Sequence, residues 1–329
     1  MSTSFAIMRS MILGVAIVAV LKSPPTAAGP PPAAFRIGVL IPQALASPAE
    51  AGLRDAFREQ GYVEGRNIVI EWRRVGDSVE DARPHAAEFV RSKTDLIVVL
   101  TTSAARAAMA ATDTIPIVFM AGDPVATGLV KSLARPGANA TGVSVVSPQL
   151  TAKRLDLLHQ LIPHARRIAF LRNPSNAQVA LQWTEAQKAA RQFGMRLDTF
   201  DARNAAEIDM ALRAIQRSSP DAILVASDLG FLMENARIAA AIRKAKIPAV
   251  FPWREYHQQG ALMSYGPNLN DALHVTASYV VKVLNGARPS DLPVEEISKF
   301  DLVIDLRVAH ELGIKVPQEL QLRANELIR

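Results

Sequence analysis

The sequence predicts an α/β fold of two Rossmann-like, doubly wound lobes joined by three crossings of the chain. The first observation behind this prediction is an internal repeat. Residues 95–124, DLIVVLTTSAARAAMAATDTIPIVFMAGDP, read as an acid, an apolar strand, a polar turn, an alanine-rich helix, an Ile-Pro step and a second apolar strand. Residues 221–253, DAILVASDLGFLMENARIAAAIRKAKIPAVFPW, follow the same order. Two similar α/β halves predict a site in the cleft between them.

The second observation is the alternation of strands with helices of ten or more residues along most of the chain. This alternation indicates βαβ units with right-handed parallel crossovers. A chain of 329 residues suits one large domain or two lobes of about 150 residues each. Hydrophobic residues make 49% and charged residues 21%, which is ordinary globular usage and excludes a mainly disordered protein.

The N-terminal residues 1–28 have the form of a secretory signal peptide. Arg9 precedes the apolar run 11–21, and small residues follow it, with cleavage expected near Ala28 or, as a second choice, Ala34. The run is shorter than the ~20 residues that span a bilayer, with an uncleaved anchor as the alternative. The sequence contains no cysteine, which excludes an N-terminal lipid anchor and disulfides. We therefore expect a soluble periplasmic protein.

The charge balance is modest. Removal of residues 1–28 takes away Arg9 and Lys22 and no acid, so the formal charge falls from +6 to +4. The basic residues are scattered, and no basic stripe interleaved with aromatic residues indicates nucleic-acid binding.

The first lobe is expected to begin with a strand at 36–41, whose continuous apolar residues suit a parallel sheet buried on both faces. A helix at 49–60 follows, with Ser47 as its N-cap and Gly61 at its C-terminal end. The stretch 67–74 alternates apolar and polar residues, which is typical of a strand near a sheet edge.

The second lobe repeats this rhythm from residue 146 onward. Its expected elements are helix 149–161, strand 167–171, helix 176–193, strand 195–200 and helix 205–217. The chain is expected to cross between lobes after 141–146, at 266–268 and over 291–304. Helix 269–284, with an apolar face, would return to the first lobe. The predicted lobes are therefore 35–145 with 267–290, and 146–266 with 291–329, where two short helical pieces close the chain.

Candidate site residues follow from the rule that ligands of doubly wound sheets bind beyond the carboxyl ends of the strands. The turns at those ends, together with two aromatic residues near the second crossing, supply the candidate ligand-binding residues. They are Gln43, Thr101, Thr102, Ser103, Asp123, Asn173, Ser227, Asp228, Trp253 and Tyr265.

The hydroxyl cluster 101–103 opens a helix, where free backbone N–H groups and the helix dipole suit a carboxylate or another anion. Ser103 could instead serve only as an N-cap. Asp123 and Asp228 could pair with a ligand ammonium, or could be simple turn residues. Trp253 and Tyr265 offer flat surfaces for stacking, with a place in the core as the alternative.

Signatures of catalysis and of metal or cofactor binding are missing from the sequence. It contains no G-x-G-x-x-G after the first strand, no P-loop, no H-E-x-x-H and no G-x-S-x-G. The six histidines are dispersed without the spacing of metal ligands, and two-lobed racemases that use paired thiols are excluded because there is no cysteine. The sequence therefore predicts a protein that is not an enzyme and needs no cofactor or metal.

Short motifs in a fixed order extend across almost the whole chain. They are GYVEGRN (61–67), DLIV (95–98), TSAA (102–105), IPIVF (115–119), DP (123–124), GLV (128–130), PG (136–137), NATG (139–142), KIP (246–248) and LGIKVP (312–317). In this order, residues 36–328 resemble the ABC-transporter substrate-binding proteins of the tryptophan/tyrosine-binding type, a branch of the type I periplasmic binding fold.

The resemblance implies a solute receptor that closes on its ligand and delivers it to a membrane permease with a cytoplasmic ATPase. It also implies that the turns 102–103, 123 and 227–228 line the cleft. Members that bind aromatic amino acids tend to have His-Pro after the first-strand Gln and Asn after the second-repeat Asp. Here Gln43 is followed by Ala-Leu-Ala-Ser-Pro, and Asp228 by Leu229. These departures lie at the predicted pocket, so the sequence leaves the identity of the solute open.

The predicted function is that of a periplasmic solute-binding component of an ABC importer. It would capture a small polar or carboxylate-bearing solute, such as an amino acid or organic acid, by closure of two lobes. A periplasmic receptor that reports ligand to a membrane signalling protein is one alternative. A secreted two-lobed enzyme, such as a transferase, is another.

Overall fold

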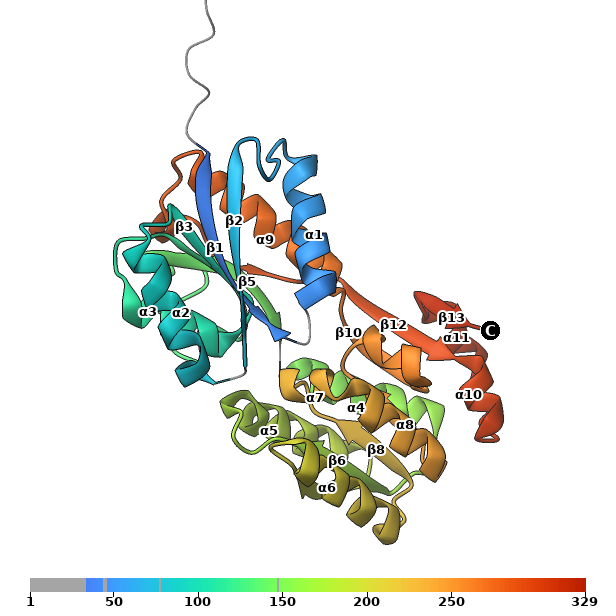
Figure 1. Ribbon diagram of the computed structural model, residues 1–329. Helices are drawn as coiled ribbons and strands as arrows, with labels where there is room; N and C mark the ends of the chain where they lie inside the picture. The colour runs from blue at the N-terminus through green and yellow to red at the C-terminus, as the bar shows by residue number, and fades with distance from the viewer. Residues whose placement is uncertain (1–33, 44–45, 77, 147) are drawn as a thin grey trace, which may run out of the picture. The chain divides into compact units, whose positions relative to one another are not determined.

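The computed structural model describes residues 34–43, 46–76, 78–146 and 148–329, and these residues form two sheets (Figure 1). The first has six strands in the order β11-β5-β4-β3-β1-β2, and the second has seven in the order β13-β12-β10-β9-β8-β6-β7. The predicted α/β class with two doubly wound sheets is confirmed. The predicted signal peptide lies outside the described residues.

The first sheet is parallel throughout. Its strands are β1 (Phe35–Pro42), β2 (Ile68–Val75), β3 (Leu96–Val99), β4 (Ile117–Gly122), β5 (Ala140–Val146) and β11 (Glu295–Glu296). Helices α1 (Ala46–Glu59) and α9 (Leu269–Leu284) contact each other on one face, and α2 (Val79–Arg91) and α3 (Thr102–Ala111) on the other (Figure 1). β3 is buried along its whole length, whereas β2 alternates and forms the edge, as its sequence predicts.

In the second sheet only the pairing of β10 with β12 is antiparallel, so β12 and β13 run opposite to the other strands. Its strands are β6 (Arg167–Arg172), β7 (Arg196–Asp201), β8 (Ala222–Val225), β9 (Ala249–Phe251), β10 (Met263–Pro267), β12 (Phe300–Asp305) and β13 (Glu326–Ile328). Its helices are α4 (Gln149–Leu161), α5 (Ala177–Gln192), α6 (Ala205–Ser218), α7 (Leu229–Met233), α8 (Asn235–Ala245), η2 (Arg254–Gln259), α10 (Leu306–Glu311) and α11 (Gln318–Arg323).

The repeat seen in the sequence corresponds to equivalent positions in the two sheets. The strand orders 2-1-3-4-5 and 7-6-8-9-10 are the same arrangement, with β3-α3-β4 matching β8-α7-α8-β9. The acid that heads each copy has the same role. Asp95 Oδ2 accepts a hydrogen bond of 2.7 Å from the backbone N–H of Arg36, and Asp221 Oδ2 accepts bonds of 2.7 and 2.8 Å from those of Arg166 and Arg167. Each acid ties the start of one strand to its neighbour in the sheet.

The C-terminal part of the chain differs from the prediction in two places. The sequence assigned 291–296 to the second lobe, but Glu295 and Glu296 pair with β5 of the first sheet. Val294 anchors this segment because its side chain is buried and its N–H donates to the Leu133 carbonyl at 2.7 Å. The strand β13 was also not predicted, since its three residues carry no periodic pattern. The other predicted lobe boundaries stay a prediction.

The helix η2 holds a buried histidine that makes stability depend on pH. His257 Nε2 lies 3.0 Å from Ser264 Oγ, and the side chain is buried. Burial lowers the pKa of the His257 imidazole from 6.5 to about 4. Between these two values the unfolded chain binds a proton that the folded chain does not, so stability falls as the pH drops through this window. Between pH 7 and pH 4, His257 alone is expected to lower the free energy of unfolding by about 3 kcal/mol.

Urea unfolding at pH 7 and at pH 4 checks this expectation. His257→Gln should lose less stability over that interval than the wild type, because its amide stays neutral. Ser132→Ala, a change at an exposed residue that does not titrate in this range, is the control and should keep the wild-type pH dependence. An unaltered pH dependence in His257→Gln would contradict the assignment.

Candidate functional site

A cavity of about 590 Å³ lies between strand ends of the two sheets. This volume is within the range of small-molecule sites. The first sheet and its helices contribute Ser78, Val79, Glu80, Asp81, Leu100, Thr101, Thr102, Ser103, Arg106, Met120, Ala121, Gly122, Thr127, Val145 and Leu269. The second contributes Asn173, Ser175, Asn176, Gln178, Arg203, Ser227, Leu229, Gly230 and Trp253.

The cavity is placed by the strand order. In each sheet the order reverses at one point, between β1 and β3 in the first and between β6 and β8 in the second. Ligands of open α/β sheets bind at such switch points. Thr101 follows β3, Asn173 follows β6 and Ser227 follows β8, so three of the predicted positions lie around the two switch points.

The first wall is the beginning of α3. Thr101, and not Ser103, is the N-cap, because its Oγ1 accepts a hydrogen bond of 2.9 Å from Ala104 N. Thr102 and Ser103 therefore occupy the first helical turn, where backbone N–H groups are not used within the helix. Their hydroxyls and N–H groups, with the positive end of the helix dipole, can donate to an anion.

The second wall consists of amide and hydroxyl side chains fixed by their neighbours. Asn173 Oδ1 accepts a hydrogen bond of 3.0 Å from Ser175 N, and Asn176 Nδ2 donates to Asp228 Oδ2 at 2.8 Å. The buried amide of Gln182 holds the backbone of Ser227 from both sides, with bonds of 2.8 and 2.9 Å. These side chains are held in place by the protein itself and need little reorganisation on binding.

Gln178 joins the two walls directly. Its Nε2 donates a hydrogen bond to the carbonyl of Gly122 at the end of β4. A side chain at residue 122 would collide with the amide of Gln178, since an added Cβ would lie 2.3 Å from Oε1. Glycine at this position therefore allows the contact between helix α5 and strand β4.

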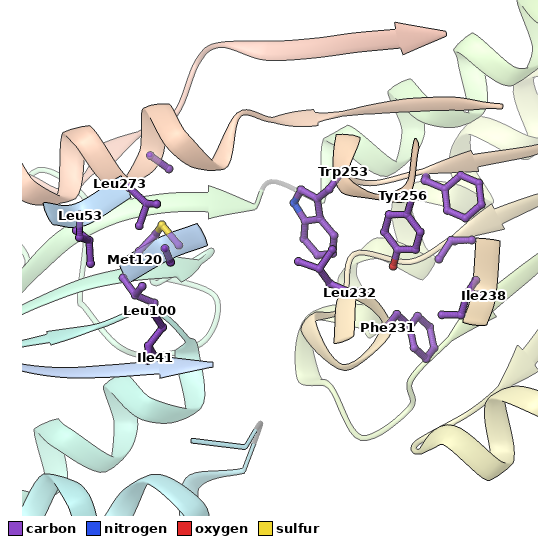
Figure 2. Close-up of a cluster of buried hydrophobic side chains, with 14 of the residues drawn as sticks. Ile41, Leu53, Leu100, Met120, Phe231, Leu232, Ile238, Trp253, Tyr256 and Leu273 are labelled. Carbon is purple, nitrogen blue, oxygen red and sulfur yellow. The ribbon is translucent and has the colours of Figure 1, made fainter. Parts of the chain in front are cut away.

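Trp253 lines the cavity and is also part of the hydrophobic core, with 4% of its surface exposed. Figure 2 shows its indole beside Leu232 and Tyr256. Trp253 therefore both lines the cavity and packs in the core, the two positions that the sequence left open as alternatives. Leu100 and Met120 supply apolar surface from the first sheet.

Four predicted site residues are not among those that line the cavity. Gln43 is exposed. Tyr265 lies in β10, where its ring centroid is 5.9 Å from that of Phe300. Asp123 closes a turn with φ of 28°, in which its Oδ1 accepts a 3.0 Å bond from Ala126 N. Asp228 is buried, and the structure turns its carboxylate towards its own helix.

Asp228 is the N-cap of α7, with Oδ1 accepting a 3.1 Å bond from Phe231 N and Oδ2 accepting from Asn176. Burial raises the pKa of the Asp228 carboxyl, while hydrogen bonds from Asn176, Phe231 and Asn173 act in the opposite direction. Both carboxylate oxygens thus accept hydrogen bonds from the protein. Asp228 does not line the cavity itself, but it positions Asn173 and Asn176, which do.

The lining includes charges that sequence reasoning missed. Glu80 and Asp81 belong to the first turn of α2, and Arg203 follows β7. The strand-end rule, applied to β2 and β7 as it was to β3 and β8, would have found them. Arg106 Nη2 donates to the Thr127 carbonyl at 2.5 Å. Among the described residues no group of His, Asp and Glu side chains is arranged to hold a metal ion.

Comparison with known proteins identifies the family. The ABC transporter substrate binding protein family matches residues 39–328. The chain belongs to this family. Substrate-binding proteins of ABC transporters act outside the cytoplasm and bind a small-molecule solute for a transporter. Among the described residues no helix is long and apolar enough to cross a membrane.

Solved substrate-binding proteins share the fold. The ABC domain from Streptococcus pneumonia in complex with L-Trp has a TM-score of 0.83 at 27% identity, covering 90% of this chain and 100% of that one. A conserved domain protein of Vibrio cholerae O1 biovar eltor has a TM-score of 0.82 at 30% identity, covering 89% and 99%. The tyrosine-binding protein of Clostridioides difficile (strain R20291) is 27% identical over 270 residues, 82% of this chain and 77% of the relative.

The predicted resemblance to tryptophan/tyrosine-type substrate-binding proteins is therefore confirmed, as is the type I periplasmic binding fold. The dimeric Lac repressor, with a TM-score of 0.59 at 14% identity, shares the fold alone. The protein is thus an ABC-type solute-binding protein whose cavity lies between two doubly wound sheets.

Proposed function

We propose that this substrate-binding protein captures an amino acid by closing its two lobes and that it catalyses no reaction of its own. The observation that carries the proposal is the cavity of about 590 Å³ whose two walls present hydrogen-bond donors beside one indole. Such a cavity grips a small carboxylate-bearing solute with an apolar side chain. The tyrosine-binding and L-Trp-bound relatives support this class of solute.

Within this proposal, five of the predicted site residues contact the solute and a sixth, Thr101, positions two of them. Thr102 and Ser103 donate to its carboxylate, Thr101 fixes the helix end that presents them, and Trp253 covers its side chain. Asn173 and Ser227 contact it from the opposite wall. Contacts from both lobes favour the closed state, because a ligand shifts an equilibrium only by its differential affinity for the two states.

The proposed site of action is the periplasm, reached through a signal peptide at residues 1–28. The proposed partners are an inner-membrane permease and its cytoplasmic ATPase, which take up the delivered solute. Radiolabelled solute should enter vesicles that contain the transporter only when this protein is added, and a sensory receptor would give no such uptake.

Titration calorimetry of the purified protein against the twenty amino acids and a set of organic acids tests the solute class. We expect binding of L-tryptophan, L-tyrosine or another apolar amino acid, and recovery of the ligand intact. The double variant Thr102→Val with Ser103→Ala should bind at least about tenfold more weakly, since a hydrogen bond to a charged group contributes ~1.5–3 kcal/mol.

The matched control is Ser132→Ala, at an exposed hydroxyl that does not line the cavity. Its affinity should equal that of the wild type. Absence of binding across the whole panel, or chemical conversion of the bound compound, would refute the proposal.

A further inference from the structure

Arg154 is a buried cation behind the second wall of the cavity. It lies on α4 with 1% of its surface exposed. Its Nε donates to the Tyr265 carbonyl at 2.7 Å and its Nη1 to Ser227 Oγ at 2.8 Å. No described carboxylate forms an ion pair with it. Burial lowers the pKa of the Arg154 guanidinium to about 9, so it remains charged at neutral pH.

A charge in this position is unfavourable without compensation. Moving an ion out of water costs several kcal/mol, which a partner of opposite charge normally offsets. Asp228 directly follows Ser227 in the sequence, but its oxygens accept from Phe231 and Asn176 and make no hydrogen bond to Arg154. The carbonyl of Tyr265 and the hydroxyl of Ser227 supply only dipoles. The protein therefore places no carboxylate in direct contact with the guanidinium of Arg154.

The contact with Arg154 determines which hydrogen-bonding group of Ser227 is left for a solute in the cavity. The backbone N–H and carbonyl of Ser227 are both bonded to Gln182. Its Oγ accepts from Arg154, so the hydroxyl proton is the remaining donor, and Ser227 lines the cavity. A hydroxyl that accepts from a cation is a stronger donor, because hydrogen bonds in a chain polarise one another.

Arg106 and Arg203, the two arginines that line the cavity, differ from Arg154 because they are exposed to solvent. Arg203 is half exposed and its Nη1 donates to Glu207 Oε2 at 3.1 Å, while Arg106 is exposed. Water and their existing partners already compensate these charges, so they discriminate weakly between charged and neutral solutes. The buried charge of Arg154 is screened much less.

We propose that Ser227, backed by Arg154, receives the acidic group of the solute, whose negative charge compensates the buried guanidinium. This inference rests on the proposed function. Arg154 does not line the cavity, so it is a positioning residue that selects an acid over its neutral analogue. The N-terminus of α3 contacts the same acidic group from the opposite wall, so this group is held between the two lobes. Closure of the lobes therefore depends on the charge of the solute.

The first arm of the test needs no ligand. Arg154→Met removes the buried charge, which no carboxylate contacts, at similar volume, so the thermal midpoint of the ligand-free protein should be unchanged or higher. Arg243→Met removes the same net charge from a half-exposed ion pair with Glu311 and is the control. A midpoint for Arg154→Met clearly below that of Arg243→Met would overturn the proposal, since Arg154 would then serve the fold.

The second arm measures selectivity by calorimetry, with L-tryptophan and L-tryptophanamide, and L-tyrosine and L-tyrosinamide, as matched probes. Arg154→Met and Ser227→Ala should each reduce the preference for the acid over the amide by about tenfold or more. Arg243→Met should keep the wild-type preference. An unchanged preference in Arg154→Met overturns the proposal. If the wild type binds no amino acid, the proposed solute class fails, and the ligand-free arm still decides the role of Arg154.

Discussion

Replacing Gly142 with alanine is expected to lower the free energy of unfolding by about 5 kcal/mol, near the upper end for single substitutions. Gly142 lies in β5 with φ of 154°, a conformation that side chains rarely adopt. An added Cβ would lie 1.9 Å from the carbonyl oxygen of Phe119 and 2.7 Å from its nitrogen. Those atoms belong to the backbone of β4, which cannot move away without breaking the pairing of β4 with β5.

Gly137→Ala is the matched control for this prediction. Gly137 also has a positive φ, 74°, but an added Cβ would have nothing within 4 Å. It should lose only about 1 kcal/mol, the cost of the backbone conformation. Urea unfolding of the two variants separates backbone strain from collision. Equal losses in both would show that space around Gly142 is not limiting.

The motif NATG, which ends at Gly142, is part of the family resemblance but serves the fold and not the binding site. In the motif NATG, Asn139 Nδ2 donates to the carbonyls of Thr112 and Ile115 at 3.1 and 2.7 Å. Thr141 Oγ1 donates to the Leu292 carbonyl at 2.7 Å. These bonds tie β5 to the loop before β4 and to the segment before β11. The motif therefore fixes β5 in the first sheet and contributes no group to the cavity.

The sequence predicts the regular elements well because burial imposes patterns on them. Helix 269–284 has the predicted bounds, since its apolar face packs against α1 and the first sheet. The short strands β11 and β13 have two and three residues and are recognised only through their partners. Elements held by pairing alone leave no periodic signal in the sequence.

The candidate site is predicted in part, for a different physical reason. The strand-end rule places a turn at the cavity but does not give the direction of each side chain. The side chains of Asp123 and Asp228 each accept a hydrogen bond from the backbone N–H three residues ahead, as short acids do in turns. Gln178 was missed because it lies in the first turn of α5, and Asn176, the N-cap of α5, because only Asn173 was taken from the turn after β6. The role of each lining residue in binding stays a prediction.

Replacing Asp228 with alanine is expected to lower the free energy of unfolding by about 4 kcal/mol, in the range for removing one partner of a buried polar network. The donors that would lose their acceptor are Asn176 Nδ2 at 2.8 Å and Phe231 N at 3.1 Å, with Asn173 and Gly230 as further donors. The affinity for the solute should fall together with stability, because Asn173 and Asn176 would no longer be held at the cavity.

Asp228→Asn distinguishes this positioning role from direct contact with a ligand ammonium. The amide keeps an oxygen for Phe231 N but turns an NH2 group towards Asn176 Nδ2, and loss of the charge that burial disfavours offsets part of this cost, so stability should change by only ~1–2 kcal/mol. If Asp228 positions its neighbours, calorimetry with L-tryptophan should show an affinity within about tenfold of the wild type. If its charge paired with the ligand ammonium, the affinity would fall by a hundredfold or more at ~3 kcal/mol for a buried charge pair, even though the protein stayed folded. The ratio of lost affinity to lost stability therefore decides which role Asp228 has.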